Sequence, residues 1–397
     1  MSVRILIAFL LACHAVPRPV AAPRALPAPT GPLAVGRTSV VWHDAARSRD
    51  LRIDIWYPAA ATDAPPAPYL ADLAAIEQTI GTPAVKTAVR KAYDAIERRA
   101  DQSYALAAPP PAPGRHRVLV FSHGFGESSQ FYAALLEDLA SCGYVVLGIE
   151  HPGDAFASVV NGRVIPFDDA AWQQARATPD GAVAYQVAQV VVHSADLRFV
   201  IDRLRTQPLP LGLDVERTRI GVFGHSLGGM AAAGVCTAEP VAACANLDAD
   251  YEGLPWLRDA GPPTRPFLFF ATPHSIYASP TLPVPTDDEL RKMSTTREAY
   301  NAEAHQTQAA QDAAMAGLAV GHRIAVETAE FTHGSFMDLG LLAPALAGEA
   351  RGRALANLAF SRRYLRAFFD TYLANKRDPA LDETSRDPRV RIERFSR

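Results

Sequence analysis

The sequence predicts an α/β fold, in which a mostly parallel sheet is covered by helices on both faces. Two observations support this class. From about residue 117 onward, short apolar runs alternate with helical patterns, which is typical of parallel strands joined by crossover helices. The chain has 397 residues, of which 49% are hydrophobic and 20% charged. This is enough for a large core and excludes a disordered chain.

The strands are predicted from apolar or β-branched runs, and the first two are separated by a polar turn at residues 47–50. The later ones are fully apolar and short, as buried strands are. In chain order, the predicted strands are Thr38–Trp42, Leu51–Tyr57, Val118–Ser122, Tyr144–Ile149, Thr218–Phe223, Ala243–Leu247, Pro266–Ala271 and, as the last strand, His322–Glu327.

The helices are predicted from apolar residues at a spacing of three to four. Between the strands they are Phe131–Ala140, Val183–Leu204, Met230–Cys236 and Ala354–Leu373. Two further helical blocks, 69–105 and 287–316, interrupt the alternation. We interpret both blocks as insertions, because they are helical segments that lie between predicted strands, and either block is a candidate for a lid.

The N-terminus is typical of an export signal at residues 1–22. Arg4 is the charged start, Ile5–Ala12 the apolar core, and Val20–Ala22 a small-residue cleavage site, although Pro23 would hinder cleavage there. The apolar core is far shorter than the roughly 20 residues of a membrane-spanning helix. We therefore expect an exported protein.

A second interpretation concerns Cys13. The text Leu10–Cys13 resembles a bacterial lipobox, which would make Cys13 a lipidated membrane anchor. In either case residues 23–36 are expected to be a Pro/Ala-rich linker, and residues 37–397 the folded domain.

The net charge and the cysteines argue against some classes of function. The formal net charge is −3, with no basic stripe that would indicate a nucleic-acid partner. Cys236 and Cys244 are candidates for a disulfide, with two buried thiols as the alternative. No Cys/His spacing resembles a zinc site, so we expect neither a metal nor a cofactor.

The text Gly224-His225-Ser226-Leu227-Gly228 lies where a predicted strand gives way to a helix. This is the context of a nucleophile elbow, in which glycines on either side of the serine avoid a collision in a sharp turn. The alternative is an ordinary Gly-rich turn or a phosphate loop, but the lysine of a phosphate loop is missing. We predict Ser226 as the nucleophile.

A serine hydroxyl needs a base, and in the elbow fold the order along the chain is serine, acid, histidine. His225 neighbours the serine, but we expect its side chain to point away along the turn. Of the histidines that follow the elbow, only His333 comes just after the predicted last strand, on a loop that reaches the carboxyl edge of the sheet. The alternative for His333 is a capping histidine on a surface loop.

The acid should end the strand after the elbow. Asp248 directly follows Ala243–Leu247 and is our candidate. Asp250 competes, and Asp338 is a third carboxylate that we expect to cap the next helix instead. The acid would hold the tautomer of the imidazole and stabilise the imidazolium.

Two backbone N–H groups must bind the oxyanion. One donor is predicted to be Leu227, the residue after the nucleophile. The other is predicted to be Phe125, on the Gly-containing loop after the strand Val118–Ser122. The alternative for that loop is a plain turn.

With these residues, the chain resembles the α/β-hydrolase superfamily, and within it the platelet-activating-factor acetylhydrolase and dienelactone-hydrolase-like esterases. The matching segments are Ile55–Pro58, Phe121–Gly124, Glu150–Gly153, Gly224–Gly229, Leu247–Asp248 and His333–Asp338. The resemblance implies a metal-independent serine esterase that acts on short or oxidised acyl esters, including phospholipids. Dienelactone enzymes use a cysteine where this chain has Ser226, and the two insertions leave the substrate open.

The sequence thus predicts an exported carboxylic-ester hydrolase with a small ester or lipid as its substrate, and it leaves the oligomeric state undetermined. An acyl pocket is expected from Phe125, Met230, Tyr251 and Phe336, with ordinary core packing as the alternative. Three rival functions stay open: a lipase or polyester hydrolase, a peptidase or amidase, and a non-catalytic binding protein on a hydrolase scaffold.

Overall fold

The computed structural model describes residues 26–79, 103–249, 263–273, 285–292, 295–342, 348–382 and 387–396. Its main feature is a ten-stranded sheet. In chain order the strands are β1 (Ala34–Asp44), β2 (Arg49–Ala59), β3 (Leu106–Ala107), β4 (His116–Ser122), β5 (Tyr144–Glu150), β8 (Val215–His225), β9 (Ala243–Leu247), β10 (Phe267–Ala271), β11 (Val320–Val326) and β12 (Val390–Ser396).

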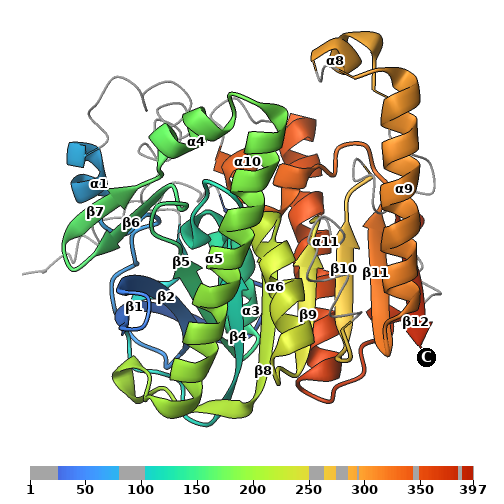
Figure 1. The fold of residues 1–397 in the computed structure, drawn as a ribbon. Helices are drawn as coiled ribbons and strands as arrows, with labels where there is room; N and C mark the ends of the chain where they lie inside the picture. The colour runs from blue at the N-terminus through green and yellow to red at the C-terminus, as the bar shows by residue number, and fades with distance from the viewer. Residues whose placement is uncertain are drawn as a thin grey trace, which may run out of the picture.

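The order of the strands across the sheet is β12-β11-β10-β9-β8-β4-β5-β2-β1-β3 (Figure 1). Pairing is parallel along the central run from β5 through β4, β8, β9 and β10 to β11. The pairs β1–β2, β2–β5 and β11–β12 are antiparallel. The predicted α/β class with a mostly parallel sheet is confirmed.

All eight predicted strands are present, but the prediction missed four others. These are β3, the edge strand β12, and a separate hairpin of β6 (Ala157–Val160) and β7 (Arg163–Pro166). The expectation that β11 is the last strand is therefore wrong, because β12 pairs with it along its whole length.

Helices cover both faces of the sheet, with α3 and α11 on one side and α5 and α6 on the other (Figure 1). Short 3-10 turns, labelled η, join several of these elements. The bounds are α1 (Leu73–Thr79), η1 (Ser129–Tyr132), α3 (Ala133–Ser141), α4 (Asp169–Ala175), α5 (Pro179–Thr206), η2 (Pro210–Gly212), α6 (Leu227–Ala238), α8 (Asp287–Lys292), α9 (Arg297–Ala316), η3 (His333–Phe336), α10 (Leu339–Leu342), α11 (Gly348–Tyr372) and η4 (Pro379–Leu381).

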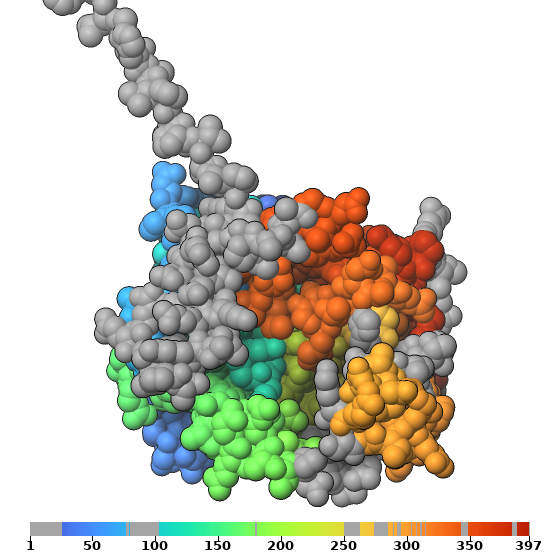
Figure 2. All heavy atoms as spheres, turned by 90° about the horizontal axis from the view of Figure 1, so that it is seen from above, coloured from blue at the N-terminus to red at the C-terminus, as the bar shows by residue number. Residues whose placement is uncertain are grey.

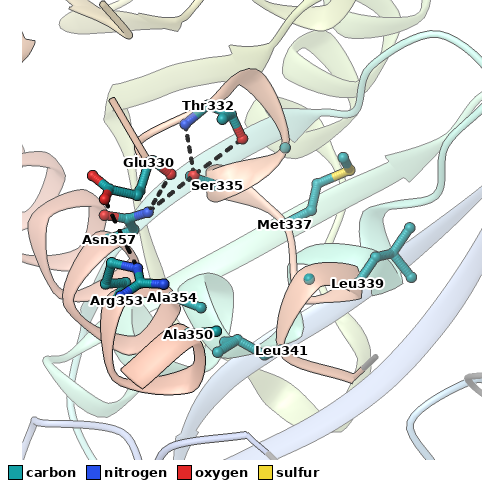
Figure 3. A pocket seen from close by; sticks show the side chains of 12 residues that line it. Glu330, Thr332, Ser335, Met337, Leu339, Leu341, Ala350, Arg353, Ala354 and Asn357 are labelled. Atoms are coloured by element: carbon teal, nitrogen blue, oxygen red, sulfur yellow. Dashed lines mark hydrogen bonds and ion pairs between the residues drawn. The ribbon is translucent and has the colours of Figure 1, made fainter. Parts of the chain in front are cut away.

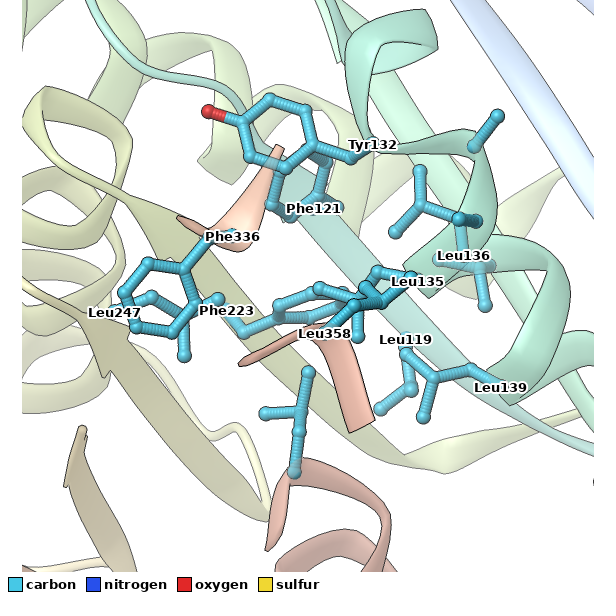
Figure 4. Packing of buried hydrophobic residues seen from close by; sticks show 14 of the residues in the cluster. Leu119, Phe121, Tyr132, Leu135, Leu136, Leu139, Phe223, Leu247, Phe336 and Leu358 are labelled. Carbon is cyan, nitrogen blue, oxygen red and sulfur yellow. The ribbon is translucent and has the colours of Figure 1, made fainter. Parts of the chain in front are cut away.

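The core forms two layers, because side chains alternate along each strand. In β4, Leu119 and Phe121 pack toward α3 and α11, whereas Val118 and Val120 pack toward α5 and α6. Figure 4 shows the first layer, where Phe121 and other aromatic and leucine side chains fill the space between the sheet and α3. Both faces are thus buried, which is why the strands are apolar throughout.

The segment before β1 is not a free linker. Leu26 is 1% exposed within the core, and Arg362 of α11 donates to the carbonyl groups of Pro27 (3.1 Å) and Ala28 (2.8 Å). The predicted linker 23–36 is therefore wrong from Leu26 onward, because these residues bury an apolar side chain and pair their backbone with α11. The export signal and Cys13 lie outside the described residues.

Both insertions are helical where the structure describes them. The block 69–105 contains α1, and its residues 80–102 lie outside the described part of the chain. The block 287–316 contains α8 and α9. Met315 of α9 is 2% exposed and packs in the core layer on the α5 and α6 side, so this insertion extends that layer.

Cys236 and Cys244 form the disulfide that was one of the two predicted alternatives, with their Cα atoms 6.1 Å apart. It joins the end of α6 to β9. These are the elements that follow Ser226 and precede Asp248, so the bridge ties together the two segments that carry the predicted nucleophile and acid.

Candidate active site

Ser226 occupies the turn between β8 and α6, with φ 52° and ψ −128°. A non-glycine residue is strained in this region, typically by about 1–3 kcal/mol. A Cβ atom at Gly224 would lie 2.2 Å from the carbonyl oxygen of Gly228, and one at Gly228 would lie 2.2 Å from that of Ser122. Side chains are thus excluded on both sides of the serine, as a nucleophile elbow requires.

Asp248 and His333 meet at the same edge of the sheet. Nδ1 of His333 lies 2.8 Å from Oδ2 of Asp248. The carboxylate also accepts hydrogen bonds from the backbone N–H (2.8 Å) and the hydroxyl (3.1 Å) of Thr272. Since Nδ1–H donates to a carboxylate, Nε2 of the neutral ring carries the lone pair that a general base needs.

The environment of His333 makes its imidazole a stronger base. Partial burial lowers the pKa of His333, but the hydrogen bond and the negative charge of Asp248 outweigh it and raise the pKa above its ordinary value. The side chain of His333 is 50% exposed, whereas that of Asp248 is 4% exposed. Neither Ser226 Oγ nor His333 Nε2 hydrogen-bonds to another residue in the described ranges. Such bonds are often long in unliganded hydrolases.

Of the other candidate acids and bases, the structure describes His322 and Asp338. Asp250 and His274 are outside the described residues. His322 is bonded to the hydroxyl of Tyr372 at 2.6 Å. Asp338 directly precedes α10, and its carbonyl accepts the N–H groups of Leu341 and Leu342. The expectation that its side chain caps this helix is wrong, because the buried carboxylate accepts from the backbone N–H of Ala134 (3.1 Å) in α3 instead.

The two predicted oxyanion donors lie on adjacent segments. Phe125 is in the loop after β4, and Leu227 is the first residue of α6. These segments are neighbours because β4 and β8 pair with Ser122 opposite Gly224. Neither backbone N–H donates to another described residue. Both N–H groups are thus unpaired within the described ranges, as the predicted oxyanion site requires. Figure 2 looks onto this face, where the β4–α3 loop (teal) and the segment around η3 (orange) border one another.

The expectation that His225 points away from the site is wrong. Its ring lies against that of His333, with centroids 4.4 Å apart, because the sharp turn directs it sideways under η3. His225 is fully buried, and its Nδ1 lies 2.6 Å from the hydroxyl of Tyr132, which also bonds Glu127. Sequence reasoning missed Tyr132 and Glu127, since only tertiary packing brings them to the elbow.

A second histidine cluster lies below the β4 loop. His151 and His193 stack with centroids 3.5 Å apart, and both bond Oγ of Ser122, at 3.0 and 3.2 Å. Asp196 binds His151 at 2.9 Å, and Asp154 binds His193 at 2.7 Å. All five residues are buried, so they support the loop rather than meet a substrate.

The predicted acyl pocket is only partly retained. Phe336 is fully buried and packs on Phe270 and Phe331, so its assignment to the pocket is wrong and core packing applies. Met230 is half-buried and packs on the core. Tyr251 lies outside the described residues.

Instead, aromatic side chains surround Phe125. Its ring contacts those of Phe167, Trp172 and Tyr185, with centroids 5.2, 4.9 and 6.1 Å apart. All four side chains are half-buried. They form an aromatic wall (Phe125, Phe167, Trp172 and Tyr185), which includes the residue whose N–H is a predicted oxyanion donor. Sequence reasoning missed this wall, because α4 and α5 supply two of its members and only tertiary packing brings them to Phe125.

A cavity of about 330 Å³ lies behind the His333 loop, between η3, α10 and α11 (Figure 3). Ser335, Met337 and Asn357 line it, and Asn357 donates to the carbonyl of Glu330 at 2.7 Å. His333 and Ser226 are not among its lining residues, so the cavity is distinct from the catalytic groups. Among the described residues, no group of three or more His, Cys, Asp or Glu side chains is placed to hold a metal ion.

The chain is similar to known hydrolases. Residues 20–163 match the family model "Platelet-activating factor acetylhydrolase, isoform II", and residues 113–247 match "Serine aminopeptidase, S33". Platelet-activating factor acetylhydrolase of Gallus gallus is 32% identical over 134 residues, which is 32% of this chain and 30% of that protein. The protein of that name from Bos taurus is 28% identical over 135 residues, which is 29% of this chain and 30% of that protein.

Among solved structures, the ferulic acid esterase from Streptomyces cinnamoneus is similar with a TM-score of 0.69 and 25% identity, over 94% of this chain and 99% of that one. The chain has the α/β-hydrolase fold. The relatives that it matches in sequence include platelet-activating factor acetylhydrolases, each matched over part of this chain only. The matched region spans about 30% of the length of those curated relatives.

Proposed function

We propose that this protein is an exported serine hydrolase of carboxylic esters that works through an acyl-enzyme. The observation that carries the proposal is the bond of 2.8 Å between His333 Nδ1 and Asp248 Oδ2, at the sheet edge where Ser226 occupies a strained elbow. This arrangement supplies a nucleophile, a base with a defined tautomer, and an acid to stabilise the imidazolium.

In the first half-reaction Ser226 Oγ attacks the ester carbonyl carbon while His333 Nε2 takes the hydroxyl proton. The N–H groups of Phe125 and Leu227 bind the oxyanion, a contribution typically worth about 10²–10³ in rate per donor. The C–O bond to the alcohol then breaks, and His333 gives its proton to the leaving oxygen. Water, deprotonated by the same base, releases the acid.

For the acyl group we propose a short or oxidised chain, including that of a phospholipid. The family-model match over residues 20–163 and the acetylhydrolase relatives support this choice. A lipase or polyester hydrolase on the same residues, and a binding protein without catalysis, are the rival outcomes of the test.

A second candidate is an ester of an aromatic acid. It is favoured by the aromatic wall, where Trp172 lies 4.9 Å from Phe125, and by the structural neighbour, which is a ferulic acid esterase. A planar acyl group would stack on such a wall, with each aromatic contact contributing about 0.5–1.5 kcal/mol.

Export is supported by the disulfide between Cys236 and Cys244, since such bonds persist in oxidising compartments. The alternative, a lipoprotein anchored at Cys13, differs only in how the chain is held after export. Among the described helices, none is both long and apolar enough to cross a bilayer.

The test is a panel of esters hydrolysed by wild type and by Ser226→Ala, purified and compared side by side. Acetyl and butyryl esters, an oxidised phospholipid, methyl ferulate, a long-chain triglyceride and polyester film distinguish the substrate classes. We expect turnover of short acyl esters that Ser226→Ala abolishes. Turnover that survives in Ser226→Ala, or none on any ester, would contradict the proposal.

A further inference from the structure

We propose that Glu127 is a positioning residue for the ester hydrolysis proposed above, on which this inference rests. Glu127 fixes the peptide unit that carries the Phe125 N–H, and through Tyr132 it holds His225 against the ring of His333. One carboxylate outside the triad would then align both the oxyanion site and the base.

The oxyanion side depends on the carbonyl of Gly124. This oxygen accepts hydrogen bonds from the backbone N–H of Glu127 at 3.2 Å and from Nδ1 of His123 at 2.7 Å. The peptide unit is planar and trans, so the N–H of Phe125 points opposite to the Gly124 carbonyl. Two donors on the carbonyl therefore fix the direction in which the Phe125 N–H points.

The side chain of Glu127 holds the same residue from its other side. Its Oε2 accepts the backbone N–H of Gly124 at 3.0 Å. A Cβ atom at Gly124 would lie only 2.5 Å from that oxygen, so the carboxylate fits because residue 124 is a glycine. The carbonyl of Glu127 is itself held by the N–H of Phe156 at 2.6 Å. The clamp on Gly124 is thus anchored to the next loop.

The base side runs through Tyr132 and His225. The hydroxyl of Tyr132 donates to Glu127 Oε2 and accepts from Nδ1 of His225, whose distance to the hydroxyl oxygen is 2.6 Å. Because a carboxylate only accepts, this order of donors assigns the proton of His225 to Nδ1. The His225 ring, so held, forms the buried surface on which the ring of His333 lies.

Glu127 also places a negative charge near His333. Burial raises the pKa of Glu127, but hydrogen bonds and charge from His225, together with the bond from Tyr132, outweigh it and lower the pKa, so the group is ionised. Among the described residues, the ionisable groups that face His333 are Asp248, His225 and, behind His225, Glu127 and Tyr132. Two carboxylates thus favour the imidazolium that forms during the reaction.

The test compares Glu127→Gln with Glu127→Ala, each normalised by the fraction of folded protein. Glutamine keeps an acceptor for Gly124 but removes the charge, so we expect kcat to fall about 3–10-fold. It should also move the acidic limb of kcat/KM to lower pH, because His333 becomes easier to deprotonate. Alanine removes the acceptor for the Gly124 N–H and the acceptor for the Tyr132 hydroxyl. We therefore expect a loss of about 10–100-fold in kcat with KM changed less than about threefold.

Glu216→Gln, at the opposite end of β8, is the matched control and should change neither kcat nor the acidic limb of the kcat/KM profile. The pKa of His333, followed by NMR of labelled histidine in wild type and Glu127→Gln, is a second readout that needs no substrate. A lower melting temperature with unchanged kcat, pH limb and His333 pKa would overturn the inference. Wild type that hydrolyses no ester would refute the proposed function, and the NMR titration would still decide the role of Glu127.

Discussion

Within the described part of the chain, two Ser–His–Asp sets are similar in chemistry and opposite in setting. Both have a histidine bonded to a carboxylate at nearly equal distance, 2.9 Å in one and 2.8 Å in the other. The buried set is closed, with the histidine bonded to the serine at 3.0 Å, whereas the histidine of the second is half exposed and its serine is free. The members are Ser122, His151 and Asp196 in the first set and Ser226, His333 and Asp248 in the second.

The difference teaches that a hydrogen-bonded chain is not enough to make a catalytic group. Burial lowers the pKa of His151 well below its ordinary value, whereas Asp248 raises that of His333. Ser122 belongs to a strand, while Ser226 is strained and adjacent to free N–H donors. Access, strain and nearby predicted oxyanion donors thus distinguish the proposed catalytic set from the buried one.

The largest effect on kcat is expected from removing the proposed nucleophile or the proposed base of the half-exposed set. Ser226→Ala and His333→Ala should each lower kcat by about 10⁴-fold or more, and the double variant should be little worse because the groups act as a unit. Ser122→Ala should instead lower the melting temperature and leave most of kcat intact. Ester hydrolysis and thermal unfolding of all four proteins measure this. Additive losses in the double variant would refute a joint mechanism.

Replacing the aspartate of each set by asparagine should separate an effect on catalysis from an effect on stability. Asp248→Asn should lower kcat by about 10³–10⁴-fold with little change in stability, because the amide favours the wrong tautomer of His333. Asp196→Asn should destabilise the fold by about 3–5 kcal/mol, since it leaves Arg47 and Arg49 facing a neutral partner. Rates and urea unfolding distinguish the two. Near-normal activity of Asp248→Asn would transfer the role to Asp250.

Ester hydrolysis and folding stability should also be lost over different pH ranges. Activity needs neutral His333, whose pKa is raised, so kcat/KM should fall tenfold per pH unit below a value higher than the ordinary 6.5. Burial lowers the pKa of His123 to about 4, so the unfolded chain takes up a proton first and stability falls progressively as the pH drops from about 6.5 to 4.

Rate profiles and unfolding midpoints on the same buffers measure both limbs. We expect activity to be lost reversibly while the protein is still folded. If inactivation coincided with unfolding, the separate titration of His333 and His123 would be refuted.

The smallest effect is expected at the aromatic wall. Trp172→Ala should lower kcat/KM for methyl ferulate about 3–10-fold relative to ethyl acetate, because it removes one aromatic contact beside Phe125. Trp172→Phe is the conservative control and should recover most of the difference. Equal losses on both esters would show that the wall does not select the acyl group.

Much of the fold was predictable because buried parallel strands carry an unambiguous apolar signal. Two missed elements also had signals. Asn161-Gly162 between the β6 and β7 runs is a hairpin turn, with φ 50° and 77°, and β12 alternates apolar and charged residues. Leu26, by contrast, sits in a Pro/Ala-rich stretch whose composition hides a single buried anchor.

Part of the candidate site was likewise predictable from the sequence, and part was not. The elbow and the order serine, acid, histidine led to Ser226, Asp248 and His333, and the structure brings the last two into contact. Phe336 was misassigned because proximity in sequence to His333 says nothing about which way a ring faces. Glu127 was missed because the role proposed for it depends on contacts with Gly124 and His225. Gly124 is close in sequence, but His225 lies about a hundred residues further along the chain and meets Glu127 only in the folded protein.

The most direct test of the central claim is the mass-spectrometric mapping of wild type after reaction with a fluorophosphonate at pH 8. The account predicts one adduct per chain, located on Ser226, formed slowly or not at all in His333→Ala, and absent from Ser122. A folded wild-type protein that gains no adduct, or carries it on another serine, would contradict it.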